Sequence, residues 1–238
     1  MPVPPFTVFL RPGAETSEND HAVPDEPIGG NIREPLDRLR DAFEPRDRRT
    51  SIRFLAEFAP HLAPALRAEG MVEGGSVELL AGTPDSLIPP REVPGLSMVI
   101  LDENSALADV REGLDTNERG FDPRAEPVTD AQAQAFRANL VDSRAFIARI
   151  NGEPAGAGMF NPPHAGVTEL LGIATVDDFR RRGVASYLSA YAASVAFERG
   201  VELVYLSTEN PAARRVYERL GFRPHAVLLF YADPPPNC

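Results

Sequence analysis

The sequence predicts a mixed α/β fold for its second half, in which hairpin strands are followed by a β-α-β-α-β succession. Three observations carry this prediction. Apolar strand-like runs alternate with runs of helical spacing, glycine and proline mark the ends of these runs, and 43% of the 238 residues are hydrophobic, which is enough for a substantial core. A chain of this length has room for one large domain or two small ones.

The predicted elements follow one another from residue 96. A first strand, "LSMVILD" (96–102), precedes two helices, "NSALADVREGLDTNE" (104–118) and "TDAQAQAFRANLVDS" (129–143), and Thr129 is the expected N-cap of the second. Three strands come next, "AFIARI" (145–150), "PAGAGMF" (154–160) and "VTELLGIATV" (167–176), of which the last is apolar enough to be central. The remainder is a helix from Gly183 to Arg199, a strand "VELVYLS" (201–207), a helix "NPAARRVYERLGF" (210–222) and a closing strand "AVLLFYA" (226–232).

The turn between the central strand and the next helix places three arginines directly before a glycine, in the pattern Arg180-x-x-Gly183-x-Ala185. Cations at a helix N-terminus oppose the helix dipole, whereas the unpaired N–H groups at that end bind phosphate. The pattern is neither a P-loop, since no Lys-Ser/Thr pair follows, nor a G-x-G-x-x-G fingerprint. From the residues alone, a solvated turn and a pyrophosphate site both stay open.

The segment "LLGIATVDDFRRRGVASYL" and the downstream "NPAARRVYERLGF" resemble the core of the GNAT superfamily of N-acetyltransferases, over roughly residues 95–232. The resemblance implies a GNAT-like acyl-CoA N-acyltransferase fold with acetyl-CoA as co-substrate and no metal. It implies that strand-end amides bind the pantetheine and acetyl carbonyl, while the turn holds the pyrophosphate. The implied cofactor-binding residues are Ile173, Ala174, Thr175, Arg180, Arg181, Arg182, Gly183, Val184, Ala185, Ser186 and Asn210. Thr175 and Ala185 are mild departures from the commoner residues of the superfamily.

Acyl transfer to an amine needs a base. An amine with a pKa near 10.4 is neutral in about one molecule in 2,500 at pH 7, so reaching the reactive form costs roughly 4–5 kcal/mol without one. The resemblance implies Glu169 as general base and Tyr217 as the general acid that protonates the leaving thiolate. The alternatives are structural: a strand carboxylate paired with an arginine for Glu169, a core tyrosine for Tyr217, and a simple helix cap for Asn210.

The first half contains a weaker copy of the same pattern. "AEFAPHLAPALRAEGM" (56–71) aligns with "TENPAARRVYERLGF" (208–222) at an offset of 151, and strand-like runs flank both stretches. A helix "NIREPLDRLRDAF" (31–43) follows a strand-like "FTVFLRP" and falls where the coenzyme-binding helix lies in the second copy. Because Leu66 replaces Tyr217 and residues 29–34 lack the arginine-glycine turn, we expect a degenerate, partial GNAT-like unit without catalysis.

The predicted organisation is therefore a degenerate unit over 1–82, a Pro-rich linker over 83–95, a catalytic GNAT domain over 96–232 and a tail over 233–238. The loop 119–128 is expected to set acceptor choice. The first unit could cover the sheet edge of the catalytic unit, form an acidic wall that suits a cationic amine, or serve solubility alone.

Charge and composition exclude several function classes. Residues 145–238 hold nine arginines and nine acidic residues, so the whole net charge of −11 arises in residues 1–144. A protein with this excess of negative charge binds nucleic acids poorly. His21, His61, His164 and His225 lack metal-ligand spacing, and the single cysteine, Cys238, excludes a disulfide framework. We expect neither a membrane span nor a signal peptide, and hence a cytoplasmic location.

The expected function is acetyl transfer from acetyl-CoA to a small-molecule amine by direct attack, without nucleic-acid or membrane partners, and with a homodimer left open. Two alternatives remain. One is a non-catalytic acyl-CoA-binding or sensing module, which would need neither Glu169 nor Tyr217. The other keeps catalysis and changes the acceptor to a protein N-terminus.

Overall fold

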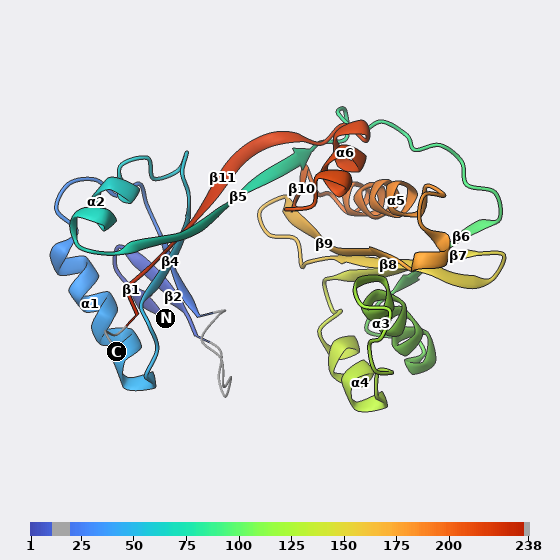
Figure 1. Cartoon of the computed structure of the whole chain (residues 1–238), viewed down its shortest axis with the longest axis horizontal. Coiled ribbons are helices and arrows are strands. Elements are labelled where there is room, and N and C mark those ends of the chain that lie inside the picture. Colours follow the sequence, from blue (N-terminus) through green and yellow to red (C-terminus); the bar gives the residue numbers. More distant parts are fainter. Residues whose placement is uncertain (11–19, 236–238) are drawn as a thin grey trace. The chain divides into compact units, whose positions relative to one another are not determined.

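The computed structural model describes residues 1–10 and 20–235, so the end of the predicted strand "FTVFLRP" and Cys238 lie outside the described residues. The chain divides into two compact units (Figure 1). Unit 1 consists of Met1–Leu79 and the residues from His225 on, and unit 2 consists of Leu80–Pro224. Strands and helices alternate in both, which confirms the predicted mixed α/β class.

Unit 2 contains every element that the sequence predicts between residues 96 and 222. These are β6 (Leu96–Leu101), α3 (Leu107–Phe121), α4 (Asp130–Ala138), β7 (Arg144–Ile150), β8 (Glu153–Phe160), β9 (Val167–Thr175), the 3-10 turn η2 (Asp177–Phe179), α5 (Val184–Glu198), β10 (Leu203–Ser207) and α6 (Pro211–Arg219). The strand order is β6-β7-β8-β9-β10, and the end of β5 (Val72–Gly82) follows β10. Strands β6 to β9 are antiparallel neighbours, whereas β10 runs parallel to β9.

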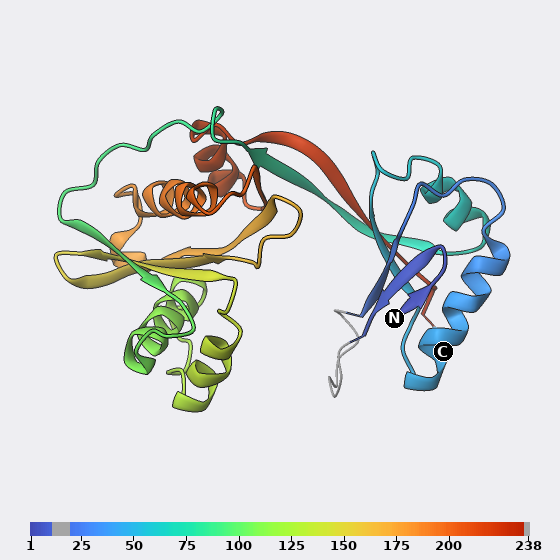
Figure 2. The ribbon, with the colours of Figure 1, turned by 180° about the vertical axis from the view of Figure 1, so that it is seen from behind.

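Helices cover both faces of the sheet of unit 2. Helices α3 and α4 lie on one face, and α5 and α6 lie on the other (Figures 1 and 2). Helix α5 buries Leu188 and Ala192 in a core that also contains Leu170 of β9 and Val204 of β10. Helix α4 begins with the expected cap, because Thr129 and Gln132 form a reciprocal capping box.

Unit 1 has its own series of paired strands and its own core. Its elements are β1 (Pro2–Val3), β2 (Phe6–Phe9), β3 (His21–Pro24), α1 (Arg33–Phe43), the 3-10 turn η1 (Glu44–Arg46), β4 (Ser51–Leu55), α2 (Leu62–Ala68), most of β5, and β11 (Arg223–Ala232). The strand order is β1-β2-β3-β4-β11. Leu36, Leu39 and Phe43 of α1 and Leu62 and Leu66 of α2 pack with strand residues in one apolar cluster.

The closing strand differs from its expected place in the catalytic domain 96–232. β11 pairs antiparallel with β4, from Leu228 opposite Leu55 to Ala232 opposite Ser51, and Tyr231 is buried in the core of unit 1. Leu80 of β5, expected in the first unit, is instead buried in the core of unit 2. The physical reason is that apolar alternation determines which face of a strand is buried, but not which strand it pairs with.

The two copies of the strand-helix-strand pattern correspond at the offset of 151. β4-α2-β5 parallels β10-α6-β11, and both helices are followed by a glycine at positive φ, 84° at Gly70 and 96° at Gly221. This order supports the interpretation of unit 1 as a degenerate copy, which stays a prediction.

Candidate active site

Strands β9 and β10 run side by side for a short distance and then separate. They pair at three positions, which are Val167 opposite Leu203, Thr168 opposite Val204 and Glu169 opposite Tyr205. β9 continues to Thr175 in contact with β8, but over residues 170–175 its other edge pairs with no strand in the described part of the chain. Apart from the Gly172 and Thr175 carbonyls, which accept hydrogen bonds from side chains, the backbone groups on that edge are therefore available to a ligand.

A bulge in β9 lies within this unpaired stretch. The β8–β9 register shifts between Ala157 and Met159, and Gly172 adopts a φ of 64°. The side-chain amide of Asn117 on α3 donates a hydrogen bond to the Gly172 carbonyl and so ties the bulge to that helix. The three strand residues predicted to bind the cofactor, Ile173 to Thr175, follow directly.

The predicted pyrophosphate turn begins α5. Gly183 is the N-cap residue with a φ of 92°, and no side chain of the described residues caps the helix, so the first N–H groups at Val184, Ala185 and Ser186 have no helical partner. Val184 is buried, and the residues before it in the turn are exposed. This is the geometry in which helix N-termini bind anions.

The three arginines of the turn have different surroundings. Arg180 forms an ion pair with Asp177 at 2.8 Å and donates hydrogen bonds to the Thr175 and Gly120 carbonyls, so it holds the end of β9 to α3. Arg181 has a positive φ of 63°, and the guanidinium of Arg182 lies over the Phe179 ring at 5.3 Å. Because Arg181 and Arg182 are exposed, they are the arginines of the turn best placed to meet an anion.

Glu169 lies at the last paired position of β9 and is half-buried. Leu170 and Val204 face α5, so alternation places Glu169 and Tyr205 on the opposite face, toward α3 and α4. Burial raises the pKa of the Glu169 carboxyl, and a hydrogen bond of 2.9 Å from Asn161 Nδ2 to Oε2 opposes that rise. An arginine partner, which belongs to the structural alternative for Glu169, is absent from the ion pairs of the described residues.

Tyr217 lies on α6 with 7% of its surface exposed, within the same apolar cluster that Ile173 contacts. Its ring packs edge-on against Phe222 at 6.1 Å, and burial raises the pKa of its hydroxyl to about 12. The structure thus brings Tyr217 and Ile173 into one core, while Glu169 lies on the other face of the sheet.

Asn210 and Thr175 differ in whether their side chains already have hydrogen-bond partners. Asn210 caps α6, because its Oδ1 accepts hydrogen bonds from the Ala212 and Ala213 N–H groups at 2.9 and 3.4 Å, which commits that oxygen to the helix. The hydroxyl oxygen of Thr175 is buried and has no hydrogen-bond partner among the described residues. A buried hydroxyl of this kind costs about 1–3 kcal/mol unless a ligand satisfies it.

Sequence reasoning missed three polar residues of the site, which are Asn117, Asn161 and Tyr205. Tyr205 faces Glu169 across the β9–β10 pair, and burial and the nearby carboxylate raise the pKa of its hydroxyl. Alternation in "VELVYLS" could have placed Tyr205 on the face opposite Val204. No local signal identifies Asn117 or Asn161, because both contacts depend on tertiary packing.

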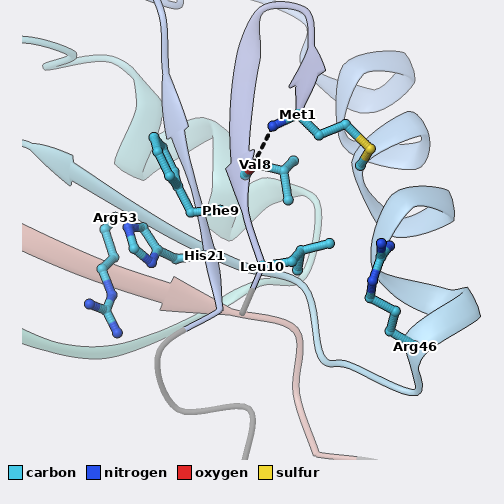
Figure 3. Close-up of a pocket in the computed structure, with 7 residues that line it drawn as sticks. All are labelled: Met1, Val8, Phe9, Leu10, His21, Arg46 and Arg53. Atoms are coloured by element: carbon cyan, nitrogen blue, oxygen red, sulfur yellow. Dashed lines mark hydrogen bonds between the residues drawn. The ribbon is translucent and has the colours of Figure 1, made fainter. Parts of the chain in front are cut away.

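A cavity of about 600 Å³ lies in unit 1 (Figure 3). It is lined by Met1, Val8, Phe9, Leu10, His21, Arg46 and Arg53. The Met1 nitrogen donates to the Val8 carbonyl at 2.8 Å, and His21 stacks on Phe9. None of these seven described lining residues carries a carboxylate side chain.

Within residues 1–10 and 20–235, no group of three or more His, Cys, Asp or Glu side chains is arranged to hold a metal ion. None of the helices described is both long and apolar enough to cross a membrane. His164, between β8 and β9, is exposed.

Residues 108–222 match the family model described as the acetyltransferase (GNAT) family. This stretch contains α3 to α6 and strands β7 to β10, and hence the bulge, the turn, Glu169 and Tyr217. No curated protein matches the chain.

Solved structures of similar fold include several acetyltransferases. A GCN5-related N-acetyltransferase from Kribbella flavida is 27% identical, with a TM-score of 0.77 over 97% of this chain and 87% of that chain. A tandem GNAT protein from the clavulanic acid biosynthesis pathway is 18% identical, with a TM-score of 0.66 over 91% of this chain and 76% of that chain. A GCN5-related N-acetyltransferase from Sphaerobacter thermophilus is 16% identical, with a TM-score of 0.57 over 86% and 67% of the two chains. The last two similarities concern the fold alone.

Proposed function

Since residues 108–222 form an acetyltransferase domain of the GNAT family, we propose that the chain transfers an acetyl group from acetyl-CoA to a small-molecule amine by direct attack. The observation that carries the proposal is the separation of β9 from β10 directly beyond Glu169. It leaves strand amides unpaired next to a carboxylate on one face and a buried tyrosine on the other.

Acetyl-CoA fits the residues along this edge. The N–H groups of Ile173 and Thr175 would donate hydrogen bonds to the pantetheine and acetyl carbonyls, and the Ile173 C=O group would accept from a pantetheine N–H. The unpartnered Thr175 hydroxyl adds one further donor. The N–H groups of Val184 to Ser186, with Arg181 and Arg182, would hold the pyrophosphate at the start of α5. Arg180 would keep the strand end and α3 in place, and Asn210 would reach the cofactor only through its amide nitrogen.

Glu169 and Tyr217 would divide the proton transfers. Glu169 accepts the proton of the amine, whose nitrogen attacks the thioester carbonyl carbon, and the C–S bond then breaks. Tyr217 donates a hydrogen bond, and finally its proton, to the departing sulfur. With a pKa of about 12 the phenol is protonated at neutral pH, as a donor must be. A substrate held between the two strands is accessible from both faces of the sheet, which suits these two positions.

The test is release of free CoA from acetyl-CoA across a panel of small amines, aminoglycosides, amino acids and short peptides. Cys238→Ser protein removes the background thiol. Turnover with one class of small amine that is lost in Glu169→Gln protein supports the proposal. Turnover with peptides alone favours a protein N-terminus as acceptor, and acetyl-CoA binding without turnover on any acceptor favours the sensing module. Folded protein that does not bind acetyl-CoA contradicts the proposal.

A further inference from the structure

Asn161 is attached to β9 by three hydrogen bonds immediately after the end of β8. Its N–H donates to the Glu169 carbonyl at 2.9 Å, its own carbonyl accepts from the Thr168 hydroxyl at 2.6 Å, and its side-chain Nδ2 donates to Glu169 Oε2 at 2.9 Å. Thr168 is buried, and Pro162 restricts the backbone of Asn161 to extended conformations. The asparagine is therefore rigid, and the direction of its amide is determined by its surroundings.

The chemistry of the pair defines which atoms meet. An ionised carboxylate only accepts hydrogen bonds, so the asparagine presents its NH2 group and not its oxygen to Glu169. This occupies Oε2 and leaves Oε1 without a hydrogen bond from Asn161. Tyr205 on β10 is the titratable group that faces the carboxylate across the strand pair. The contact is on the α3 and α4 face, where the proposed base would receive its proton.

We propose that Asn161 is a positioning residue. Its hydrogen bond occupies Oε2 of Glu169, so that Oε1 is the oxygen that takes the proton of the acceptor amine. The inference rests on the proposed function for its catalytic meaning, but the contact itself is a property of the free protein. Two consequences follow. The carboxylate is held in one rotamer, and its ionised form is favoured against the effect of burial.

The decisive variant is Asn161→Ala, with Asn161→Asp as a second variant that keeps the shape of the side chain. In protein without any substrate, the pKa of Glu169 is measured by carbon NMR of glutamate labelled at the carboxyl carbon, with Glu169→Gln identifying the signal. Asn161→Ala should raise this pKa because a donor to the ionised form is lost. Asn161→Asp should also raise it, because a second negative charge disfavours ionisation.

Activity gives the second readout, on the best acceptor. Asn161→Ala should lower kcat by about 10- to 100-fold, leave KM for acetyl-CoA unchanged, and move the acid limb of the kcat/KM profile to higher pH together with the measured pKa. In a Glu169→Gln background the same substitution should have little further effect. Asn139→Ala is the matched control and should change neither readout. It removes the exposed asparagine that caps the C-terminal end of α4 and is bonded to the Ala135 carbonyl.

The outcomes separate the inference from the proposed function. An unchanged Glu169 pKa in both Asn161 variants overturns the positioning role, whatever the activity. A raised pKa together with full activity of the Glu169→Gln enzyme overturns Glu169 as base, and with it the catalytic meaning of the contact. A raised pKa with a parallel shift of the acid limb supports both.

Discussion

At the scale of single residues, burial acts in different ways on the two proposed catalytic groups. Glu169 must be ionised to act, and burial disfavours its ionised form, so the site needs a compensating donor such as Asn161. Tyr217 must be protonated to act, and burial favours that form without any partner. A low-dielectric site therefore supports a tyrosine acid directly, but supports a carboxylate base only with added hydrogen bonds.

Glu169→Gln should lower kcat by about 10²–10⁴-fold and remove the acid limb of the kcat/KM profile. The sign follows from the raised pKa, because a base is lost when it is protonated, so wild-type activity falls as the pH drops through a value above that of an ordinary glutamate. The measurement is kcat/KM against pH for both proteins. An acid limb that persists unchanged in the variant would assign the base to another group.

Tyr217→Phe should lower kcat by about 10²–10⁴-fold while the affinity for acetyl-CoA is retained. Because its pKa is about 12, ionisation of Tyr217 should not reduce wild-type activity at pH 10, where an ordinary tyrosine is half ionised. Steady-state rates and calorimetric binding at neutral pH, with rates repeated at pH 10, test both statements. Unchanged kcat in the variant would mean that water protonates the thiolate.

The sequence points to the proposed catalytic pair but not to its surroundings. Tyr217 lies within the motif "NPAARRVYERLGF", and Glu169 directly precedes the motif "LLGIATVDDFRRRGVASYL". Asn161 and Tyr205 contact Glu169 from a loop and from another strand, and such contacts depend on register, which a single sequence does not specify. Asn210 shows the reverse, since its simpler role as a helix cap is the one that the hydrogen bonds display.

At the scale of elements, local sequence signals predict well where helices and strands occur, but they predict poorly how the strands pair. Thr129 with Gln132, and Gly200 and Gly221 after their helices, mark helix ends through chemistry that acts within a few residues. The separation of β9 from β10 beyond Glu169 and the bulge at Gly172 leave no comparable pattern, because both are properties of strand pairing. These two features are also what make the edge of β9 available to a ligand.

The start of α5 can be tested with two glycines that flank the same helix. Gly183 has a φ of 92° and Gly200 a φ of 87°, so aspartate at either position is strained by about 1–2 kcal/mol. Gly183→Asp should abolish acetyl-CoA binding, since it adds bulk and negative charge at the proposed pyrophosphate site, where a Cβ would also lie 3.1 Å from Val93 Cγ2. Gly200→Asp, with nothing within 4 Å of its Cβ, should retain binding.

Isothermal titration of acetyl-CoA into both variants, after denaturant unfolding has shown similar stability, gives the comparison. Equal affinity in the two proteins would remove the start of α5 from the cofactor site. Loss of binding in both would indicate that strain alone, and not the charge at the turn, is responsible.

At the scale of the whole molecule, β5 and β11 each belong to two units. The sequence predicts both as strands, yet it assigns each wholly to the unit in which its own repeat lies. Tyr231 is instead buried with the residues of unit 1, and Leu80 with those of unit 2. These strands have 11 and 10 residues, and the boundary between the units falls within both, after Leu79 and after Pro224, which single-sequence patterns cannot reveal.

The degenerate copy predicted in unit 1 lacks a counterpart of Tyr217. Leu66 on α2 occupies the position that Tyr217 occupies at the offset of 151, and it is fully buried in the core of unit 1. Leu66→Ala should therefore lower the free energy of unfolding by about 2–5 kcal/mol, through lost apolar contacts and a residual cavity. Because no acyl-transfer group is expected in this unit, kcat and KM for acetyl-CoA should be unchanged for the folded protein.

Leu188→Ala on α5 is the matched control, because the same side chain is removed from an equally buried position in unit 2. Its loss of stability should be of similar size, but it should also raise KM for acetyl-CoA, since Leu188 lies about one turn after the proposed pyrophosphate site. Urea unfolding gives the stability of each variant, and initial rates at a temperature well below unfolding give the kinetic constants. A rise in KM for Leu66→Ala as large as that for Leu188→Ala would show that unit 1 takes part in cofactor binding, and the interpretation of unit 1 as a non-catalytic copy would have to be abandoned.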